Sequence, residues 1–578
     1  MAGRKKRHKT SYQNHMAGEQ RGWNDLLLPV LLVVAILPFI VYFKEYQSGL
    51  ARFAWYGIDD TVTDFYTYYK SRFLIWIGVA CTIVLLFRLP LYPEKRKRLK
   101  PFVPLFVYAL LVVVSALLSV DKGLSLTGAP YMYENVFVLL TYVAVCFYTY
   151  QVMETDKDYK AVHRAVCVML CGMLVIGLFQ VAGRDLLNME GVQRLVMNKE
   201  DEALYLGTFE DVFTRSYVYL MTMNPNYAGH FLAMALTYIL AFLFTEKDKK
   251  YRIAYGCLFV VLFVLLWMTY SRGALVAFAV GVVCACICSG ILKKRSKKML
   301  VRAVGITAAA CVFAVLLDAA GGFHFLGRMM DAKEEIHLEK ITTGERVTIV
   351  YDGRTQVIDD LEEGEVRTIS LDGRDWNFIR ENGVYTYINE FGKYDQIPEI
   401  PAVDFKGYEY LGSGRVYIWS RVLPLLSKYF FLGSGPDTFL EAFPQNDYVG
   451  KANYSHSVTM YIEKAHNGYL MCWVQTGFPA LCCLLIFAAV IWGKGACRLR
   501  SKRKTEENST DDMRGNMKER MQIAALCSVC AYAAGLFFHD STLFTTPFAC
   551  VCMGIVAAGE ERLSGAKESR MINKKEKR

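Results

Sequence analysis

Repeated long apolar runs constrain the fold of this 578-residue chain more than any other feature. Each run has about 18–20 residues, enough for a helix to cross roughly 30 Å of hydrocarbon. We predict twelve spans, at about 25–43, 73–91, 102–119, 133–150, 163–182, 227–244, 253–270, 274–292, 299–317, 466–493, 521–538 and 541–558. The expected fold is therefore an all-α polytopic membrane protein of about twelve transmembrane helices.

Basic residues fall on alternate sides of these spans. With the N-terminus in the cytoplasm, the inside segments are 1–24, 88–100, 151–164, 246–252, 293–302, 494–520 and 559–578, and they hold 41 of the 66 Lys and Arg. The short outside loops 120–132, 271–273 and 539–540 hold one, one and none. This asymmetry predicts that both termini are cytoplasmic. It also explains the net charge of +11 by contact with anionic membrane lipid, so no nucleic-acid partner is needed.

The largest outside segment, 318–465, is acidic, with 24 Asp and Glu against 15 Lys and Arg. Within it, 345–392 alternates like short strands and contains two Asp-Gly pairs that are typical of tight hairpins. We predict five parts: a basic tail (1–24), a membrane bundle of nine spans (25–317), an extracytoplasmic loop (318–465), three further spans (466–558) and a second basic tail (559–578). The loop would carry the small β-rich insertion at 345–392 and a motif-bearing segment at 411–465.

The cysteines do not point to a disulfide framework, because the outside segment 318–465 contains none of the 17. Cys284-x-Cys286-x-Cys288 and Cys527-x-x-Cys530 have spacings seen in metal ligands. Both lie in apolar helices without an evident complementary His or Cys cluster. We interpret them as small packing residues and predict neither a metal site nor a cofactor.

A few cations on the predicted outer side stand apart from this pattern. Arg272, in Ser271-Arg-Gly273, sits alone between two spans, where a cation either reaches for the headgroups or binds an anion. Arg415 follows a Gly-Ser-Gly turn, and Arg215 precedes the helix-start sequence Asn224-Pro-Asn226. Guanidinium groups pair bidentately with phosphate oxygens, so arginines that converge at a membrane surface suit a diphosphate leaving group.

His466 is the candidate base. A neutral imidazole near pH 7 can orient an attacking hydroxyl or accept its proton. Asn467, Arg421 and Asn226 are further candidates for support of the site. Taken singly, each of these residues has an ordinary explanation: a packing histidine, surface arginines, or helix caps. Gly433 and Gly435 are by default turn formers.

The motifs in this order resemble the O-antigen ligase and O-antigen polymerase superfamily. They are Asn-Pro-Asn-x-Ala, Ser-Arg-Gly at a span junction, Gly-x-Arg-x-x-Ile-Trp, Gly-x-Gly-x-x-Thr-Phe, and His-Asn-x-x-Leu before Gln-Thr-Gly-Phe-Pro, all within about 215–490. The resemblance implies a metal-independent, inverting glycosyltransferase of the C class in the cytoplasmic (inner) membrane of a bacterium. It places the family's diphosphate-binding arginines on Arg272 and Arg415, less firmly on Arg215, and its essential histidine on His466. Pro436-Asp437 inside the glycine-rich motif and the large β insertion depart from the pattern.

The resemblance also implies the partners. The donor would be an undecaprenyl-diphosphate-linked glycan and the acceptor a glycan or lipid, with other polysaccharide-assembly proteins nearby. Polymerisation, ligation and transfer to protein serine or threonine all share these motifs. From a different class, a transporter of polysaccharide or lipid-linked sugar would need ionisable groups at mid-membrane and repeated halves, which the sequence does not favour.

Overall fold

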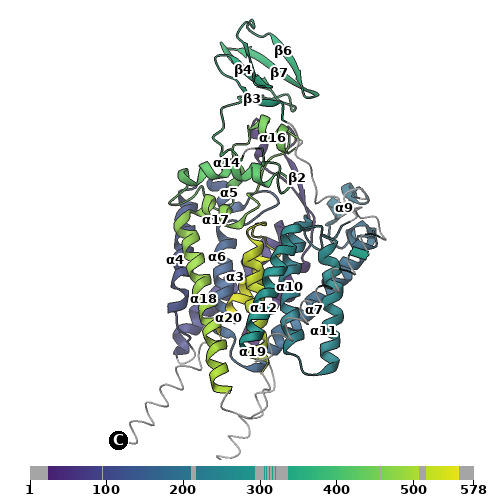
Figure 1. Ribbon diagram of the computed structural model, residues 1–578, viewed down its shortest axis with the longest axis vertical. Helices are drawn as coiled ribbons and strands as arrows, with labels where there is room; N and C mark the ends of the chain where they lie inside the picture. Colours follow the sequence, from purple (N-terminus) through teal and green to yellow (C-terminus); the bar gives the residue numbers. More distant parts are fainter. Residues whose placement is uncertain are drawn as a thin grey trace, which may run out of the picture.

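The computed structural model describes residues 24–93, 96–209, 217–292, 336–405, 407–455, 457–506 and 516–558, with isolated positions between 305 and 319. Its helices are α2 (Leu28–Ala35), α3 (Tyr68–Leu91), α4 (Val103–Leu117), α5 (Lys122–Thr127), α6 (Val136–Val152), α7 (Asp156–Val181), α8 (Glu190–Gln193), α9 (Lys199–Tyr205), α10 (Pro225–Thr245), α11 (Lys249–Trp267), α12 (Arg272–Leu292), α14 (Arg415–Lys428), α15 (Phe439–Ala442), α16 (Tyr448–Tyr454), α17 (Gly468–Thr476), α18 (Phe478–Glu506), α19 (Met517–Gly535) and α20 (Thr546–Ala557). The long ones form one upright bundle (Figure 1).

The described helices confirm a polytopic membrane protein, but they do not confirm twelve spans. Six are long and apolar enough to cross a membrane: Tyr68–Leu91, Lys100–Leu117, Asp156–Val181, Pro225–Thr245, Lys249–Trp267 and Phe478–Arg498. Four shorter apolar helices accompany them, at Asp25–Phe39, Val136–Val152, Arg272–Cys288 and Thr546–Ala557. The predicted ninth span, 299–317, lies almost wholly outside the described residues.

The predicted single span 466–493 is two helices in the structure. α17 ends at Thr476 and α18 begins at Phe478, with Gly477 between them at a φ of +88°. A Cβ at Gly477 would lie 2.3 Å from the Phe431 carbonyl oxygen, so only glycine fits this break. The Phe478 amide also donates a hydrogen bond of 2.7 Å to the Phe430 carbonyl. The loop after α14 therefore sets where the helix ends, which hydropathy does not register.

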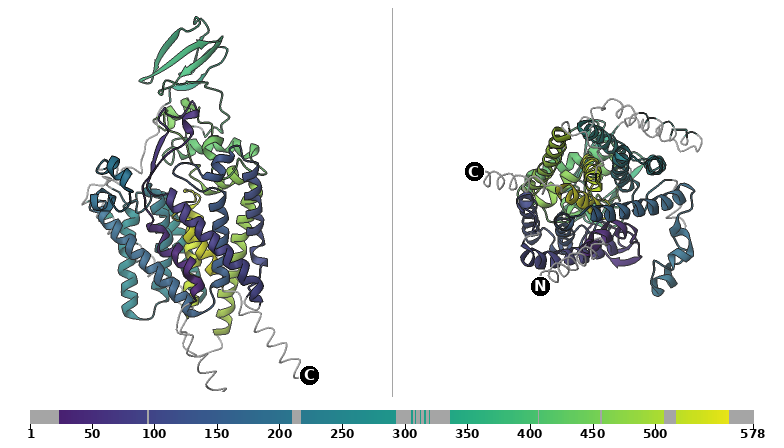
Figure 2. Two further views of the ribbon diagram at one scale, coloured as in Figure 1. Left: turned by 180° about the vertical axis from the view of Figure 1, so that it is seen from behind. Right: turned by 90° about the horizontal axis from the view of Figure 1, so that it is seen from below.

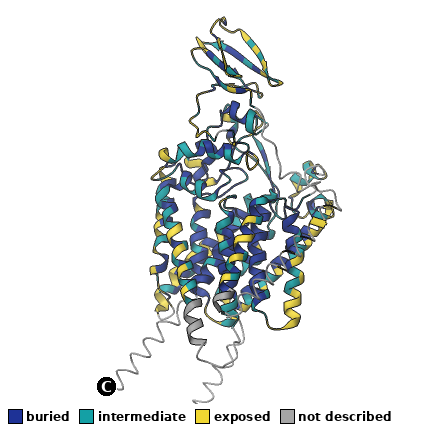
Figure 3. Ribbon diagram, viewed as in Figure 1, coloured by how far each residue is buried: buried dark blue, intermediate teal, exposed yellow. Residues whose placement is uncertain are grey.

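Helix α10 is the centre of the bundle, and almost all of its residues are buried. Figure 3 shows the buried colour along α10 and exposed positions along the outer helix α11. α10, α12 and α19 pack tightly against one another, and small residues allow the close approach. A Cβ at Gly281 of α12 would overlap Thr237 of α10 at 2.2 Å and Ala531 of α19 at 3.0 Å.

The β-rich insertion predicted from the Asp-Gly pairs is present. Its strands are β3 (Leu338–Thr342), β4 (Val347–Tyr351), β5 (Arg354–Ile358), β6 (Val366–Leu371), β7 (Arg374–Glu381), β8 (Val384–Ile388) and β9 (Tyr394–Asp395), in antiparallel sheets ordered β3-β4-β5 and β6-β7-β8-β9. Asp352, Asp372 and Asn382 have positive φ, and each precedes a glycine that also does. Two-residue turns of that kind match the twist of a hairpin. A separate hairpin pairs β1 (Lys44–Gln47) with β2 (Thr61–Asp64).

The two ends of the bundle differ in composition. The sheets β3–β9 project from one end, hereafter the site end, as both side views show (Figures 1 and 2). At the other end, segments that the charge pattern assigns to the cytoplasm meet in ion pairs. Arg88 in the last turn of α3 pairs with Glu154 before α7, and Arg520 of α19 pairs with Glu246 after α10 at 2.5 Å. These contacts bring the predicted inside segments together on one side.

Candidate functional site

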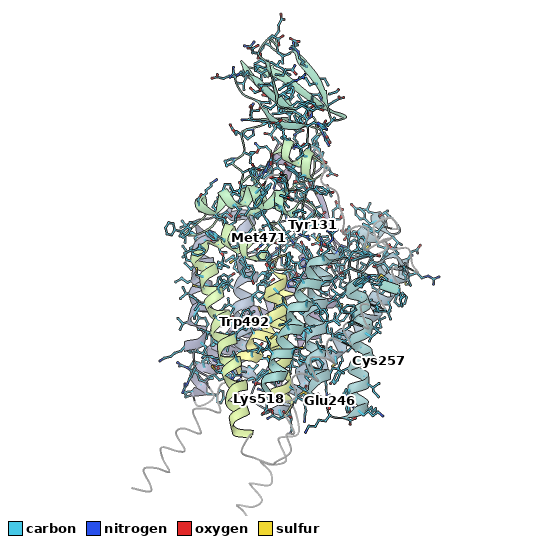
Figure 4. The ribbon with its side chains drawn as sticks, in the orientation of Figure 1. Tyr131, Glu246, Cys257, Met471, Trp492 and Lys518 are labelled. Atoms are coloured by element: carbon cyan, nitrogen blue, oxygen red, sulfur yellow. The ribbon has the colours of Figure 1, made fainter. Side chains whose placement is uncertain are left out.

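Several helices of the bundle begin at the site end. α10 begins at Pro225, α12 at Arg272, α14 at Arg415 and α17 at Gly468. Figure 4 places Met471 of α17 and Tyr131 at this end, and Glu246 and Lys518 at the opposite end. Each helix N-terminus carries a partial positive charge and amide groups that have no partner within the helix. Their convergence gives the site end a built-in preference for anions.

The α19–α20 loop, Leu536–Thr545, packs against the start of α12. A Cβ at Gly273 would lie 2.5 Å from the Phe538 Cβ and 2.9 Å from the His539 Nε2. Ser271 Oγ lies 3.5 Å from that same nitrogen. In the Ser-Arg-Gly sequence, the serine and the glycine therefore contact the α19–α20 loop, and Arg272 is the first residue of α12.

Arg272 and Arg415 come close to each other. Burial lowers the pKa of Arg415, Asp540 opposes that fall, and the nearby charge of Arg272 adds to it. Arg415 Nη1 donates to the Gly412 carbonyl at 3.2 Å, whereas its Nε is buried and has no hydrogen-bond partner among the described residues. A buried donor left in this state is available to an acceptor from a ligand.

His466 and Asn467 stand at the start of α17. The Asn467 side chain caps the helix, accepting from the amides of Tyr469 and Leu470 at 3.0 and 3.1 Å. His466 has a φ of +50°, a strained conformation for a non-glycine residue. Its Nδ1 lies 3.3 Å from Asp540 Oδ2, and the other oxygen of Asp540 accepts from the Asn467 amide at 3.2 Å. One buried carboxylate thus contacts both residues of the His-Asn motif: it accepts a hydrogen bond from the Asn467 amide and lies at ion-pair distance from His466 without a hydrogen bond.

Positive φ recurs in the other motifs. Tyr270 precedes Ser-Arg-Gly, Ser413 lies within Gly-Ser-Gly-Arg, and Asp437 lies within the glycine-rich motif, with φ of 53°, 58° and 61°. Such strain persists only where surrounding contacts enforce it, and it clusters at functional sites. The motifs therefore share a backbone feature that their letters do not show.

His539 and Asp540 are site residues that the sequence analysis missed, having treated 539–540 only as a short loop without Lys or Arg. Both are about 1% exposed. Burial holds the pKa of His539 well below its usual range, and the nearby guanidinium of Arg415 adds to this. A His-Asp pair in a two-residue link between apolar runs was the available signal.

Lys464 and Tyr227 are two further buried polar residues near the His466 segment. Lys464 is 3% exposed, and its Nζ lies 4.4 Å from the centre of the Tyr227 ring. Burial opposes the charge, yet the pKa of Lys464 is raised because Tyr227 and the neighbouring carboxylates stabilise the cation. The site therefore holds a fixed positive charge next to the His466 segment.

The glycine-rich turn serves packing. Ser434 and Gly435 amides donate to the carbonyls of Val474 and Gln475 at 2.7 and 2.9 Å. A Cβ at Gly433 would overlap the Gln475 backbone at 2.2 Å. The turn thus docks on the end of α17 and fixes that helix. Asp437, the departure from the family pattern, is buried; one of its oxygens accepts from the Ala129 amide at 2.7 Å.

The remaining predicted residues have other surroundings. Arg421 Nε donates to Asp447 Oδ2 at 2.8 Å, in a pair that is mostly buried. Asn226 lies in the first turn of α10, where its amide donates to the capping side chain of Asn224 at 2.9 Å. Arg215 lies outside the described residues. Arg421 thus joins α14 to the loop before α16.

Residues 257–485 match the O-antigen ligase family. No curated protein matches the chain. The matched region includes Arg272, Arg415 and His466, and it confirms the resemblance drawn from the motifs. The match, together with the membrane-spanning helices, supports a multi-pass membrane protein with a glycosyltransferase-like role in polysaccharide assembly.

Proposed function

We propose that this O-antigen ligase-type chain transfers or polymerises undecaprenyl-diphosphate-linked oligosaccharide on the outer face of the cytoplasmic membrane. The observation that carries the proposal is the proximity of two arginines whose charges interact, Arg272 and Arg415, to a histidine beside a buried carboxylate, His466, at one end of the bundle. That set supplies both halves of a glycosyl transfer: stabilisation of a leaving diphosphate and activation of an attacking hydroxyl.

The donor diphosphate would bind between Arg272 and Arg415. The buried, unpartnered Nε of Arg415 offers a hydrogen bond, and the helix starts at Arg272 and Arg415 add positive dipole ends. Because Asp540 also lies close to Arg415, the pocket keeps one compensating negative charge when the anion is absent. Charge that develops on the leaving diphosphate is then stabilised without reorganisation of the protein.

His466 would act on the acceptor. Because Nδ1 lies 3.3 Å from Asp540 Oδ2, His466 would use its Nε2 to accept the proton. The hydroxyl oxygen of the acceptor attacks the anomeric carbon, the bond from that carbon to the diphosphate oxygen breaks, and the hydroxyl proton passes to His466. Attack opposite the leaving group inverts the anomeric centre. Every step uses side chains of this chain, so the proposal is metal-independent.

A cavity of about 320 Å³ offers room for part of the lipid. It lies among α4, α6, α17, α18, α19 and α20, and its lining is mainly apolar, with Leu105, Val143 and Trp492 as examples. It reaches the site at Gly468, next to the His-Asn motif, and at Ser541, next to Asp540. An isoprenoid chain that enters there would hold its diphosphate near the arginines.

The test is a reconstituted reaction with purified protein and radiolabelled undecaprenyl-diphosphate repeat units, with chelator present. A ladder of lipid-linked products identifies a polymerase. Transfer only after addition of a membrane-lipid or a protein fraction identifies a ligase or a protein O-oligosaccharyltransferase, respectively. Absence of transfer under all three conditions would refute the proposal and favour a transporter.

Two variants locate the chemistry. Arg272→Ala and His466→Ala should each lower turnover at least 100-fold, the scale of a lost acid–base or electrostatic contribution. Arg367→Ala is the matched control, because Arg367 pairs with Asp360 on the exposed β insertion. Normal turnover by Arg272→Ala would contradict the assignment of the diphosphate site.

The orientation has its own test. Thr355 is exposed on β5, and the segment 318–465 contains no native cysteine. Thr355→Cys should react with a membrane-impermeant thiol reagent in intact cells. Protection of that cysteine until the cells are lysed would place the β insertion, and with it the site end, in the cytoplasm.

A further inference from the structure

The two cysteine motifs that the sequence leaves apart meet in the structure. Cys284 and Cys288 lie one turn apart on α12, and Cys527 and Cys530 lie one turn apart on α19. α12 begins at the site end and α19 ends there, so the helices run antiparallel with these turns side by side. The interpretation that neither motif has a complementary cluster is therefore wrong, because each supplies the cluster that the other lacks.

Three of the four sulfur atoms form one cluster, and the fourth is in contact with it through Cys284. The thiols of Cys284, Cys288 and Cys527 all lie within 4.8 Å of one another, and the Cys530 sulfur lies 3.3 Å from that of Cys284. In a tetrahedral thiolate site with metal–sulfur bonds of about 2.3 Å, neighbouring sulfurs are about 3.8 Å apart. The Cys284–Cys530 spacing is shorter than that value, and no spacing within the three-thiol cluster exceeds 4.8 Å, so small rotamer changes would bring these thiols to ligand distance.

We propose that Cys284, Cys288, Cys527 and Cys530 bind one thiophilic metal ion that fastens α12 to α19. Each sulfur that binds as a thiolate releases its proton and donates an electron pair to the metal, a sulfur that stays a neutral thiol keeps its proton, and no oxidation state changes. At a rise of about 1.5 Å per residue, Cys284 lies about 18 Å along α12 from Arg272. The ion is thus remote from the proposed transfer chemistry and its role is structural.

Small-residue packing explains part of this arrangement but not all of it. Helices in membranes approach closely through Gly, Ala, Ser and Cys, and Gly281 and Ala531 do so here. Alanine or serine would serve that purpose equally well at the four positions. Packing does not explain why the close positions are all occupied by cysteines, whose thiols are soft metal ligands. Convergent thiolates are the ligands that Zn²⁺ and Cu⁺ select.

Burial bears on which ion fits. Cys288 is 4% exposed and Cys527 is fully buried, whereas Cys284 and Cys530 are half-buried. Zn²⁺ with four thiolates carries a formal charge of −2, and such charge is costly in apolar surroundings. Cu⁺ with two thiolates carries only −1, with the other two sulfurs as neutral thiols. The surroundings therefore favour Cu⁺, and the shared chemistry is thiolate ligation.

The test measures metal content in the full chain. Protein is purified in detergent without chelator from cells supplied with zinc or with copper, and bound metal per chain is measured by mass spectrometry of the elements. We expect about one ion per chain, copper or zinc, and its loss in Cys284→Ser. Cys286→Ser is the matched control, because Cys286 is on the same helix, outside the cluster; it should keep the ion.

Stability gives a second readout that is independent of activity. A chelator should lower the thermal midpoint of the native chain and of Cys286→Ser, and it should leave that of Cys284→Ser unchanged. If Cys284→Ser fails to fold, Co²⁺ added to the chelator-treated native chain should produce thiolate-to-cobalt absorption bands.

Two results would overturn the inference: an absence of bound metal in every preparation, or a Cys284–Cys530 disulfide, seen as a mass lower by two hydrogens.

Discussion

Asp540→Asn is the most direct test of how the site is held. The substitution removes a buried negative charge 3.3 Å from His466 Nδ1 and keeps an amide oxygen that can accept from the Asn467 amide. The helix start should survive, and the electrostatic support of a protonated imidazole should be lost. Asp540 would then be a positioning residue that acts through His466.

The magnitude follows from the geometry. Unit charges 3.3 Å apart interact by about 5 kcal/mol at an effective dielectric constant of 20 and by about 1 kcal/mol in bulk water. The His466 side chain is 31% exposed, so solvent screens the pair and a value of about 2 kcal/mol is appropriate. Since about 1.4 kcal/mol is a factor of ten, the expected loss is on the order of 30-fold in turnover.

The assay is the reconstituted transfer reaction, run on Asp540→Asn, His466→Ala and the double variant. If Asp540 acts only through His466, the double variant should be no slower than His466→Ala alone, because residues that act as a unit are not additive. Thermal midpoints should stay within a few degrees of the native chain. Native turnover in Asp540→Asn, or fully additive losses in the double variant, would refute the reasoning.

Three further predictions concern stability. Gly273→Ala should destabilise the chain by about 1–3 kcal/mol, because its new methyl meets the α19–α20 loop at 2.5 Å, whereas Gly256→Ala has open space; thermal unfolding of both in detergent compares them. Burial raises the pKa of Asp437 to about 8, so the folded state retains a proton that the unfolded chain releases, and stability should fall by about 1.4 kcal/mol per pH unit between about 4 and 8. Asp437→Asn should flatten that dependence, and a profile unchanged from the native chain would contradict the burial argument. Arg421→Ala should lower the free energy of unfolding by about 3–5 kcal/mol, because Asp447 stays buried without its ion-pair partner. Chemical denaturation of an Asp447→Asn/Arg421→Met double variant tests whether that loss comes from the uncompensated charge.

The sequence by itself determined the local features of this protein. Apolar runs gave membrane helices because hydrocarbon accepts only segments whose backbone groups are paired within themselves. Asp352 and Asp372 gave hairpin turns because an Asp-Gly pair tolerates positive φ. Arg272 and His466 could be selected because a lone cation and an imidazole at span ends are unusual against an apolar background, and Arg415 could be selected from the motif that surrounds it. Each of these inferences needs only neighbours in the chain.

Only the tertiary structure decided which distant groups meet. His466 lies beside Asp540, 74 positions away in the sequence, because the start of α17 packs against the α19–α20 loop. Cys284 contacts Cys530, 246 positions away, because α12 packs against α19. The break at Gly477 depends in the same way on a loop that presses a carbonyl against it. Hydropathy and turn propensity report the cost of placing one residue in one environment. The partners of a buried charge or thiol depend on the packing of whole helices, which a single sequence does not display.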